Sequence, residues 1–381
     1  MTLHSTAMKS QPNPAAQVCD VPSVLRRSQI ENLESAGGTL QFRLTMTSSL
    51  RSTVFLIIVV CYPTLALAQK SLAVFDEFAD LFQQNYAFFD LRGVDWEQQK
   101  KIYRPKLAAS TSNDELFAIL CQMVDPLNDG HVFVSTGSKG CGSGKRLAWE
   151  AKAAAIEDFI QKKYLKSKAK HSGPLTYGMI DGSTGYIDIH HMEGCKSFLG
   201  YARRTAKEMD EALVAMKGVV KIIIDVRFNG GGNDECALGF AERFTDKKRM
   251  AYSKETYSKG SYGSHLDLYI SPADKTNTTA KVVVLTSRAT ASAAEMFVMA
   301  MMALPQVTIL GEPTRGIHSD IYLKKLSNGW QLGLSNQKYI LPNGKVYEKD
   351  GLPPHNFMSF KGDVLEQGRD DLLEHAIGLS R

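Results

Sequence analysis

Apolar residues follow two different spacings along the chain, and the two spacings occupy different regions. Between residues 72 and 123 they recur every three or four positions, as in amphipathic helices. Ser112 followed by Asn, Asp and Glu marks a helix start there, because such residues cap free backbone amides. Beyond residue 184, short β-branched runs alternate with helical patterns. The pattern therefore predicts a small helical domain followed by an α/β core.

The α/β region is predicted to repeat a buried strand, a loop and a helix. The run Val219–Val226 is mostly β-branched, which is typical of a strand buried on both faces. Strands are expected over residues 131–135, 185–189, 219–226, 281–285 and 307–310, and helices over 150–164, 201–216, 237–244 and 291–304. Shorter alternating strands with Asn-Gly turns are expected over 321–347.

The first 68 residues differ from the rest of the chain. Residues 1–45 are polar and lack periodicity, whereas residues 46–68 combine Arg51, the apolar run Val54–Cys61 and a small-x-small ending. This arrangement is typical of a secretory signal peptide, and the apolar run is shorter than the roughly 20 residues of a membrane span. We therefore expect export to the periplasm or the extracellular space, with no stable membrane insertion after the signal peptide is cleaved. Residues 1–45, which precede the signal peptide, are expected to be a mis-assigned extension.

Four segments follow from these patterns. They are a leader over 1–68, a helical N-terminal domain over 69–130, a short strand-and-helix linker over 131–184, and the α/β core over 185–381. Composition is that of an ordinary globular protein, with 44% apolar and 22% charged residues. The net charge is only +5 and no basic stripe is interleaved with aromatic residues, so nucleic acid is not expected as a partner.

Cysteine and histidine usage argues against a metal centre. The four cysteines beyond the leader contain no C-x-x-C pair, and they allow three complete disulfide pairings, which the sequence leaves open. These cysteines are Cys121, Cys141, Cys195 and Cys236. His190 and His191 could join Cys195 at a metal, but strand alternation sends the two histidines to opposite faces. We therefore expect no metal and no cofactor.

A glycine-rich loop and a serine follow two of the buried strands. Gly230, Gly231 and Gly232 could cradle a phosphate or an oxyanion, but the acids that follow them oppose an anionic phosphate. Ser292 lies where a strand gives way to a helix, so its hydroxyl could act as a nucleophile beside free backbone amides. Small residues around Ser292 are also compatible with plain close packing.

A serine nucleophile needs a base. His131 follows a glycine turn at the junction between the two predicted domains, and His318 follows the segment Gly311–Gly316. Residue patterns alone leave the choice between these two histidines open.

Four motifs together resemble one family. They are Asn128–His131, Asp225–Gly232, Thr290–Glu295 and Gly311–Gly316, in the order found in tail-specific (C-terminal processing) serine peptidases. The resemblance extends over about residues 72–354 and is greatest to the branch of the tricorn core and interphotoreceptor retinoid-binding protein. It implies a Clp-protease/crotonase-like spiral of ββα units, an α/β fold, after a small helical domain.

The resemblance also implies site residues. Ser292 would be the nucleophile and His131 its base, with Glu348 steadying the imidazolium directly or through a neighbour. The backbone amides of Gly231 and Ala293 would form the oxyanion hole. The implied activity is that of an exported serine endopeptidase acting on peptides or proteins through an acyl-enzyme. A non-catalytic carrier of an apolar, retinoid-like or lipid-like ligand is the alternative, and the oligomeric state stays open.

The sequence departs from the family pattern at three positions. Gly130 stands where the tricorn core has serine, and Ile317 stands where another branch has its catalytic lysine. His355 replaces the aspartate of the closing Pro-Asp motif. The 53 residues between His131 and Gly185 are too few for the PDZ domain of many relatives in addition to the predicted strand and helix.

Overall fold

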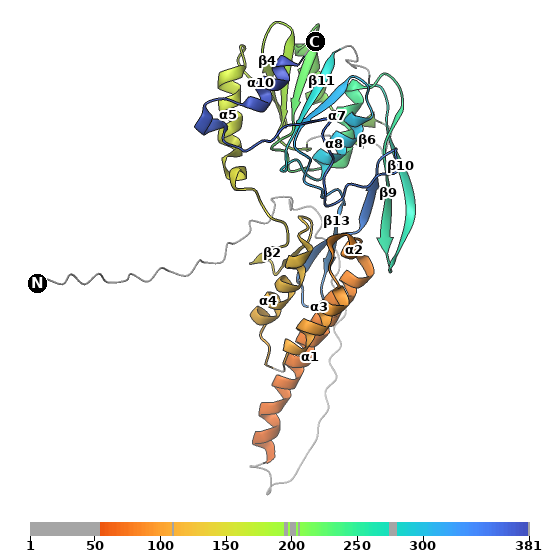
Figure 1. Ribbon diagram of the computed structural model, residues 1–381. Helices are drawn as coiled ribbons and strands as arrows, with labels where there is room; N and C mark the ends of the chain where they lie inside the picture. Colours follow the sequence, from red (N-terminus) through yellow and green to blue (C-terminus); the bar gives the residue numbers. More distant parts are fainter. Residues whose placement is uncertain are drawn as a thin grey trace, which may run out of the picture.

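The computed structural model of the protein describes residues 54–108, 110–193, 197–198, 203–204, 206–273 and 280–379. A helical region lies at one end and an α/β body at the other (Figure 1). The expected leader as far as residue 53, and Cys195, lie outside the described residues. Residues 54–68 form the start of helix α1, Val54–Asn85. Across the described ranges, no helix combines the length and apolar character needed to cross a bilayer.

Helices fill the N-terminal region, as the spacing of apolar residues predicts. After α1 come α2 (Phe89–Arg92), α3 (Trp96–Tyr103) and α4 (Asn113–Val124), with 3-10 turns at Arg104–Lys106 and Asp125–Leu127. Ser112 caps α4: its hydroxyl accepts the Glu115 N–H at 3.2 Å, and the Glu115 carboxylate accepts the Ser112 N–H at 2.7 Å. This reciprocal pair satisfies two amides that lack helical partners.

Strands from two distant parts of the sequence form a small antiparallel sheet against these helices. Its order is β13-β14-β1-β2, and the strands are Ile321–Lys325, Gln331–Ser335, Phe133–Ser135 and Gly140–Gly142, respectively. Residues such as Phe78 and Leu120 share one apolar core with Leu332 of β14. The N-terminal helices and a late part of the chain therefore pack as one unit.

A disulfide joins Cys121 of α4 to Cys141 of β2. It settles one of the pairings that the sequence leaves open. Cys236 is disulfide-bonded as well. The bond at Cys121 fastens the small sheet to the helical region.

A seven-stranded sheet forms the body. Its order is β16-β12-β11-β8-β5-β4-β3; the first five strands are parallel, β4 is antiparallel to β5, and β3 is antiparallel to β4. The strands are Asn356–Phe357, Val307–Gly311, Lys281–Thr286, Lys221–Asp225, Thr184–Ile189, Leu175–Met179 and Lys170–Ser172, in the same order. Every residue of β8 is buried, as its β-branched run predicts.

Helices cover both faces of this sheet, which confirms the predicted mixed α/β fold with an N-terminal helical region. On one face lie α6 (Lys207–Ala215), α7 (Asp234–Ala241), the 3-10 turn Glu242–Phe244 and α8 (Ala293–Met302). On the other lie the 3-10 turn Ala148–Lys152 with α5 (Ala153–Tyr164), and α9 (Val364–Gln367) with α10 (Asp371–Gly378). The helix predicted over 201–216 begins only at Lys207, because Arg203–Arg204 (β7) pairs with Ser197–Phe198 (β6).

A long hairpin reaches from the body to the helical region. Its strands are β9 (Arg249–Ser258) and β10 (Ser261–Ile270), and β9 also pairs with β15 (Gln337–Ile340). At the tip the Gly260 N–H donates to the Gln84 carbonyl at 3.2 Å, so the hairpin contacts the end of α1 (Figure 1).

Candidate active site

Sheet topology brings the glycine loop and Ser292 together. Strands β8 and β11 are parallel neighbours, so the loops that leave their carboxyl ends emerge side by side. The Ala291 N–H donates to the Asn229 carbonyl at 3.0 Å, which ties the two loops directly. The predicted nucleophile and the predicted oxyanion loop therefore lie at one edge of the sheet.

Ser292 occupies a strained backbone position immediately before α8. Its φ of 55° and ψ of −128° fall in a region that non-glycine residues rarely adopt. Gly231 lies against it: a Cβ on Gly231 would come within 2.7 Å of the Ser292 Cβ and 3.1 Å of the Ala293 nitrogen. Only glycine fits there, because φ of Gly231 is also positive at 110°.

The two amides expected to form the oxyanion hole differ in their present contacts. The Ala293 N–H belongs to the first turn of α8, where backbone amides have no acceptor within the helix. The Gly231 N–H donates to the Asn229 Oδ1 at 2.9 Å, and the Gly231 carbonyl accepts the Met192 N–H at 2.8 Å. The Gly231 amide therefore has to leave Asn229 before it can bind another oxygen.

Glu295 is a buried hub that the sequence analysis missed. Its carboxylate accepts the Ser292 N–H at 3.0 Å and the backbone amides of Gly316 and Ile317 at 2.8 and 3.0 Å. The Thr314 hydroxyl also donates to it at 2.5 Å. Burial acts to raise the pKa of Glu295, but the neighbouring His318 and these donors hold it below its usual value. The ionised carboxylate thus fixes the turn that carries Ser292.

His318 lies between two buried carboxylates. Its Nε2 is 3.0 Å from Glu295 Oε1, and its Nδ1 is 3.8 Å from Glu348 Oε2. Burial acts to lower the pKa of His318, but the charges of Glu295 and Glu348 raise it above the usual value. The ring is therefore suited to carry a positive charge within the site.

Glu348 connects His318 to the helical region. Its Oε2 accepts the His318 backbone N–H at 2.9 Å, and its Oε1 pairs with Arg92 at 3.2 Å. Arg92 also lies 3.9 Å from the Asp129 carboxylate. Burial raises the pKa of Glu348 to about 7, with Asp129 adding to the shift while His318 and Arg92 oppose it.

His131 is also buried beside this network. Its backbone N–H donates to Asp129 Oδ1 at 3.0 Å, and among the described residues its Nδ1 has no hydrogen-bond partner. Burial lowers the pKa of His131, although the charges of Asp129 and Glu295 act in the opposite direction. The ring is therefore suited to be neutral at neutral pH and able to accept a proton.

The predicted residues thus belong to one buried network that includes Glu295. The carboxylate that contacts His131 is not the predicted Glu348. The Glu348 carboxylate accepts from Arg92 and from the His318 backbone, and the Asp129 carboxylate accepts from the His131 backbone. Two sequence signals could have indicated the roles of Glu295 and Asp129. For Glu295, the signal is its place three residues after Ser292, which is the spacing of a capping box. For Asp129, it is the place two residues before His131 in the same motif.

Two departures from the family pattern pack against each other. A Cβ on Gly130 would come within 2.9 Å of the Ile317 Cδ1, and a Cβ on Gly144 would come within 2.6 Å of the Gly130 Cα. Gly130 is therefore confined between Ile317 and Gly144. The third departure is His355, whose Nδ1 accepts the Ile309 N–H at 3.0 Å. This bond lies near the edge of the large sheet, because Ile309 belongs to β12.

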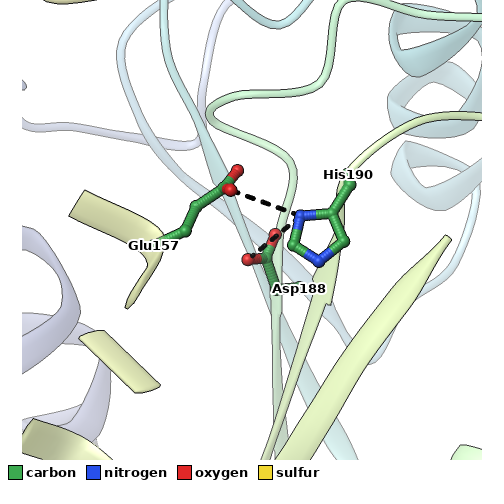
Figure 2. Close-up of side chains that lie close together, drawn as sticks. All are labelled: Glu157, Asp188 and His190. Carbon is green, nitrogen blue, oxygen red and sulfur yellow. Dashed lines mark ion pairs between the residues drawn. The ribbon is translucent and has the colours of Figure 1, made fainter. Parts of the chain in front are cut away.

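A second cluster of polar side chains lies on the opposite face of the sheet from α8. Glu157 of α5, Asp188 of β5 and His190 each place one ligand atom within 4.8 Å of the others, and both carboxylates form ion pairs with the His190 ring (Figure 2). Among the described residues this is the group that could hold a metal ion.

Comparison with known proteins identifies the class to which this site belongs. The profile of Peptidase family S41 matches residues 183–356, and that of the Tricorn protease C1 domain matches residues 68–125. The chain therefore carries a peptidase family S41 domain preceded by a tricorn C1 domain, as the four motifs predict.

Particular relatives agree with this assignment. The carboxy-terminal processing protease CtpA of Bacillus subtilis is 31% identical over 179 residues, which cover 46% of this chain and 35% of that protein. The chloroplastic C-terminal processing peptidase of Tetradesmus obliquus is 27% identical, over 42% of this chain and 35% of that protein. The chain spans about a third of the length of these curated relatives.

Among solved structures, one described as a candidate peptidase of Parabacteroides merdae shares 27% identity and a TM-score of 0.70. The match covers 81% of this chain and 96% of that chain.

Proposed function

We propose that the protein is a serine endopeptidase in which Ser292 attacks the carbonyl carbon of a peptide bond. The observation that carries this proposal is the strained turn at Ser292, which packs against Gly231 at the start of α8. Such a turn exposes a serine hydroxyl beside helix amides, as the attack requires. The S41 match supports the same reaction.

His131, rather than His318, is the proposed base. A base must accept a proton, and burial keeps the pKa of His131 below its usual value. His318 has a raised pKa and is enclosed by Glu295 and Glu348. Glu295 accepts the Ser292 amide and its charge also acts on His131, which supports the proximity of base and nucleophile.

The reaction follows from these assignments. His131 takes the proton of the Ser292 hydroxyl as the oxygen bonds to the substrate carbonyl carbon, and the C–N bond then breaks as the proton passes to the leaving amine. Water hydrolyses the resulting ester by the same proton transfers in reverse. The Ala293 amide, and the Gly231 amide once released from Asn229, would stabilise the oxyanion.

Glu348 is a positioning residue in this proposal. It holds Arg92 and His318, and Arg92 in turn lies beside Asp129, which bonds to the backbone of His131. Glu348 therefore acts on His131 through neighbours. This network also joins the helical region to the α/β body, so we propose that the site forms only when the two pack together.

We also propose that the protein acts outside the cytoplasm. The signal-peptide pattern over residues 46–68 supports export, and the disulfide between Cys121 and Cys141 suits an oxidising compartment. The charge of the chain and its peptidase domain support a peptide or protein as substrate.

Hydrolysis of a quenched fluorescent peptide library by the purified protein tests the proposed function. Ser292→Ala should abolish turnover, and His131→Gln should lower it by several orders of magnitude, as expected when a triad member is removed. His318→Gln should fold less stably, but its Ser292 should still react with a covalent probe for serine nucleophiles. Absence of turnover in the folded wild-type protein, together with tight binding of a retinoid or fatty acid, would instead favour the carrier function.

A further inference from the structure

Three acceptor groups converge on the face of the sheet opposite to α8. The His190 Nδ1 lies 3.4 Å from Glu157 Oε2 and 3.6 Å from Asp188 Oδ2. Figure 2 shows both carboxylates directed at this ring nitrogen; Glu157 belongs to α5 and Asp188 to β5. All three ligand atoms lie within 4.8 Å of one another.

The other side of the ring fixes its orientation. His190 Nε2 lies 2.8 Å from the Thr176 hydroxyl, which in turn lies 2.9 Å from His171 Nδ1. If Nε2 carries the proton and donates to Thr176, the hydroxyl can donate onward to His171. Nδ1 then presents a lone pair to the two carboxylates. Metal-binding histidines are commonly oriented in this way, by a hydrogen bond from the nitrogen that does not bind the metal.

Asp188 supplies an independent observation. It is only 2% exposed, and the structure pairs its carboxylate with the His190 ring, whose Nδ1 lies 3.6 Å away. A buried carboxylate is costly unless a cation neutralises it. The carboxylate is directed into the cluster, so the cation it requires would lie between Asp188, Glu157 and His190.

The distances also match those between ligands of one metal ion. A charge-assisted hydrogen bond from a protonated histidine to a carboxylate is usually about 2.7–2.9 Å long. Ligands about 2.1 Å from a tetrahedral Zn²⁺ are separated by about 3.4 Å from one another. The separations of 3.4 and 3.6 Å therefore agree with a shared ion between the three groups.

We propose that Glu157, Asp188 and His190 form a binding site for a divalent transition-metal ion of the zinc type. One nitrogen and two oxygen ligands suit Zn²⁺ or Co²⁺ and leave a position for water, whereas Mg²⁺ prefers oxygen ligands alone. The site is separate from Ser292 and does not depend on the proposed peptidase activity. It adjoins the glycine loop, because the Asn229 amide donates to the Ile189 carbonyl at 2.8 Å.

Isothermal titration of the purified full chain, without an affinity tag, with ZnCl₂ tests the site. We expect one site that MgCl₂ does not fill, and an affinity that falls about 100-fold or more in His190→Ala and in Glu157→Gln. The matched controls are His191→Ala, the neighbouring histidine, and Asp158→Asn, the next residue of α5; both should bind as the wild type does.

Visible absorption of the Co²⁺-loaded protein provides a second readout. Intense bands typical of four-coordinate Co²⁺ should appear in the wild type and both controls and be lost in His190→Ala. Circular dichroism confirms that each variant is folded. Failure of the folded wild type to bind Zn²⁺, or equal binding by His190→Ala and the wild type, would overturn the proposal and leave an ion pair between protonated His190 and the two carboxylates.

Discussion

Gly130 and Ile317 should show energetic coupling because they occupy one another's space. A Cβ at Gly130 would lie 2.9 Å from the Ile317 Cδ1, and Gly144 prevents Gly130 from moving away. In Gly130→Ala the Ile317 side chain must rotate to relieve this contact. A rotation of about 30° from the preferred angle costs roughly 0.5–1.5 kcal/mol. Ile317→Val removes Cδ1, so the contact is absent in the double variant.

A double-mutant cycle measures this coupling in the free energy of unfolding by urea. Ile317→Val alone should cost about 0.5–1.5 kcal/mol. Gly130→Ala also reduces the entropy of the unfolded chain, but that contribution cancels in the cycle. We expect the double variant to be more stable than the sum of the single effects by about 1 kcal/mol. The control pairs Gly182→Ala with Ile317→Val, since a Cβ at Gly182 meets nothing within 4 Å. Additivity at Gly130, equal to that at Gly182, would refute the packing explanation.

Three further predictions concern the network and the disulfide. Because the pKa of Glu348 is about 7 when folded and 4.5 when unfolded, the folded state binds more protons between these values, so stability falls as pH rises from 4.5 to 7. In Glu348→Gln the thermal midpoint should lose this part of its pH dependence; an unchanged profile would contradict it. The pKa of His131 is lowered, so the rate at which a fluorophosphonate labels the protein should fall to half of its plateau at a pH below 6.5. A fall centred above pH 6.5 would exclude His131 as the base. Replacing Cys121 and Cys141 by serine should lower the unfolding free energy by about 3 kcal/mol, given the 20-residue separation; urea denaturation measures it, and no change would contradict it.

Periodicity predicted the main elements because most of them bury one face or both. The fully buried strand β8 and the capped helix α4 are examples in which one local pattern suffices. The hairpin β9–β10 was not predicted, because much of it is exposed and its residues do not alternate clearly between polar and apolar. Strand β9 also pairs with β15, and the paired residues lie more than 80 positions apart in the sequence.

The site was predictable only as far as single motifs extend. Ser292, Gly231 and His131 each belong to a recognisable stretch, whereas the role of Glu295 depends on amides of residues 316 and 317. Arg92 joins Glu348 across 256 residues. The cluster at His190 escaped prediction because Glu157 comes from a different element, so no local spacing reveals it.

Covalent labelling at Ser292 tests the central claim most directly. The purified protein is incubated with a fluorophosphonate, and the modified residue is located by mass spectrometry of its peptides. We predict one adduct per chain at Ser292, absent from Ser292→Ala and formed several orders of magnitude more slowly in His131→Gln than in the wild type. An adduct at another residue, or a folded wild-type protein that takes up no probe, would contradict the account.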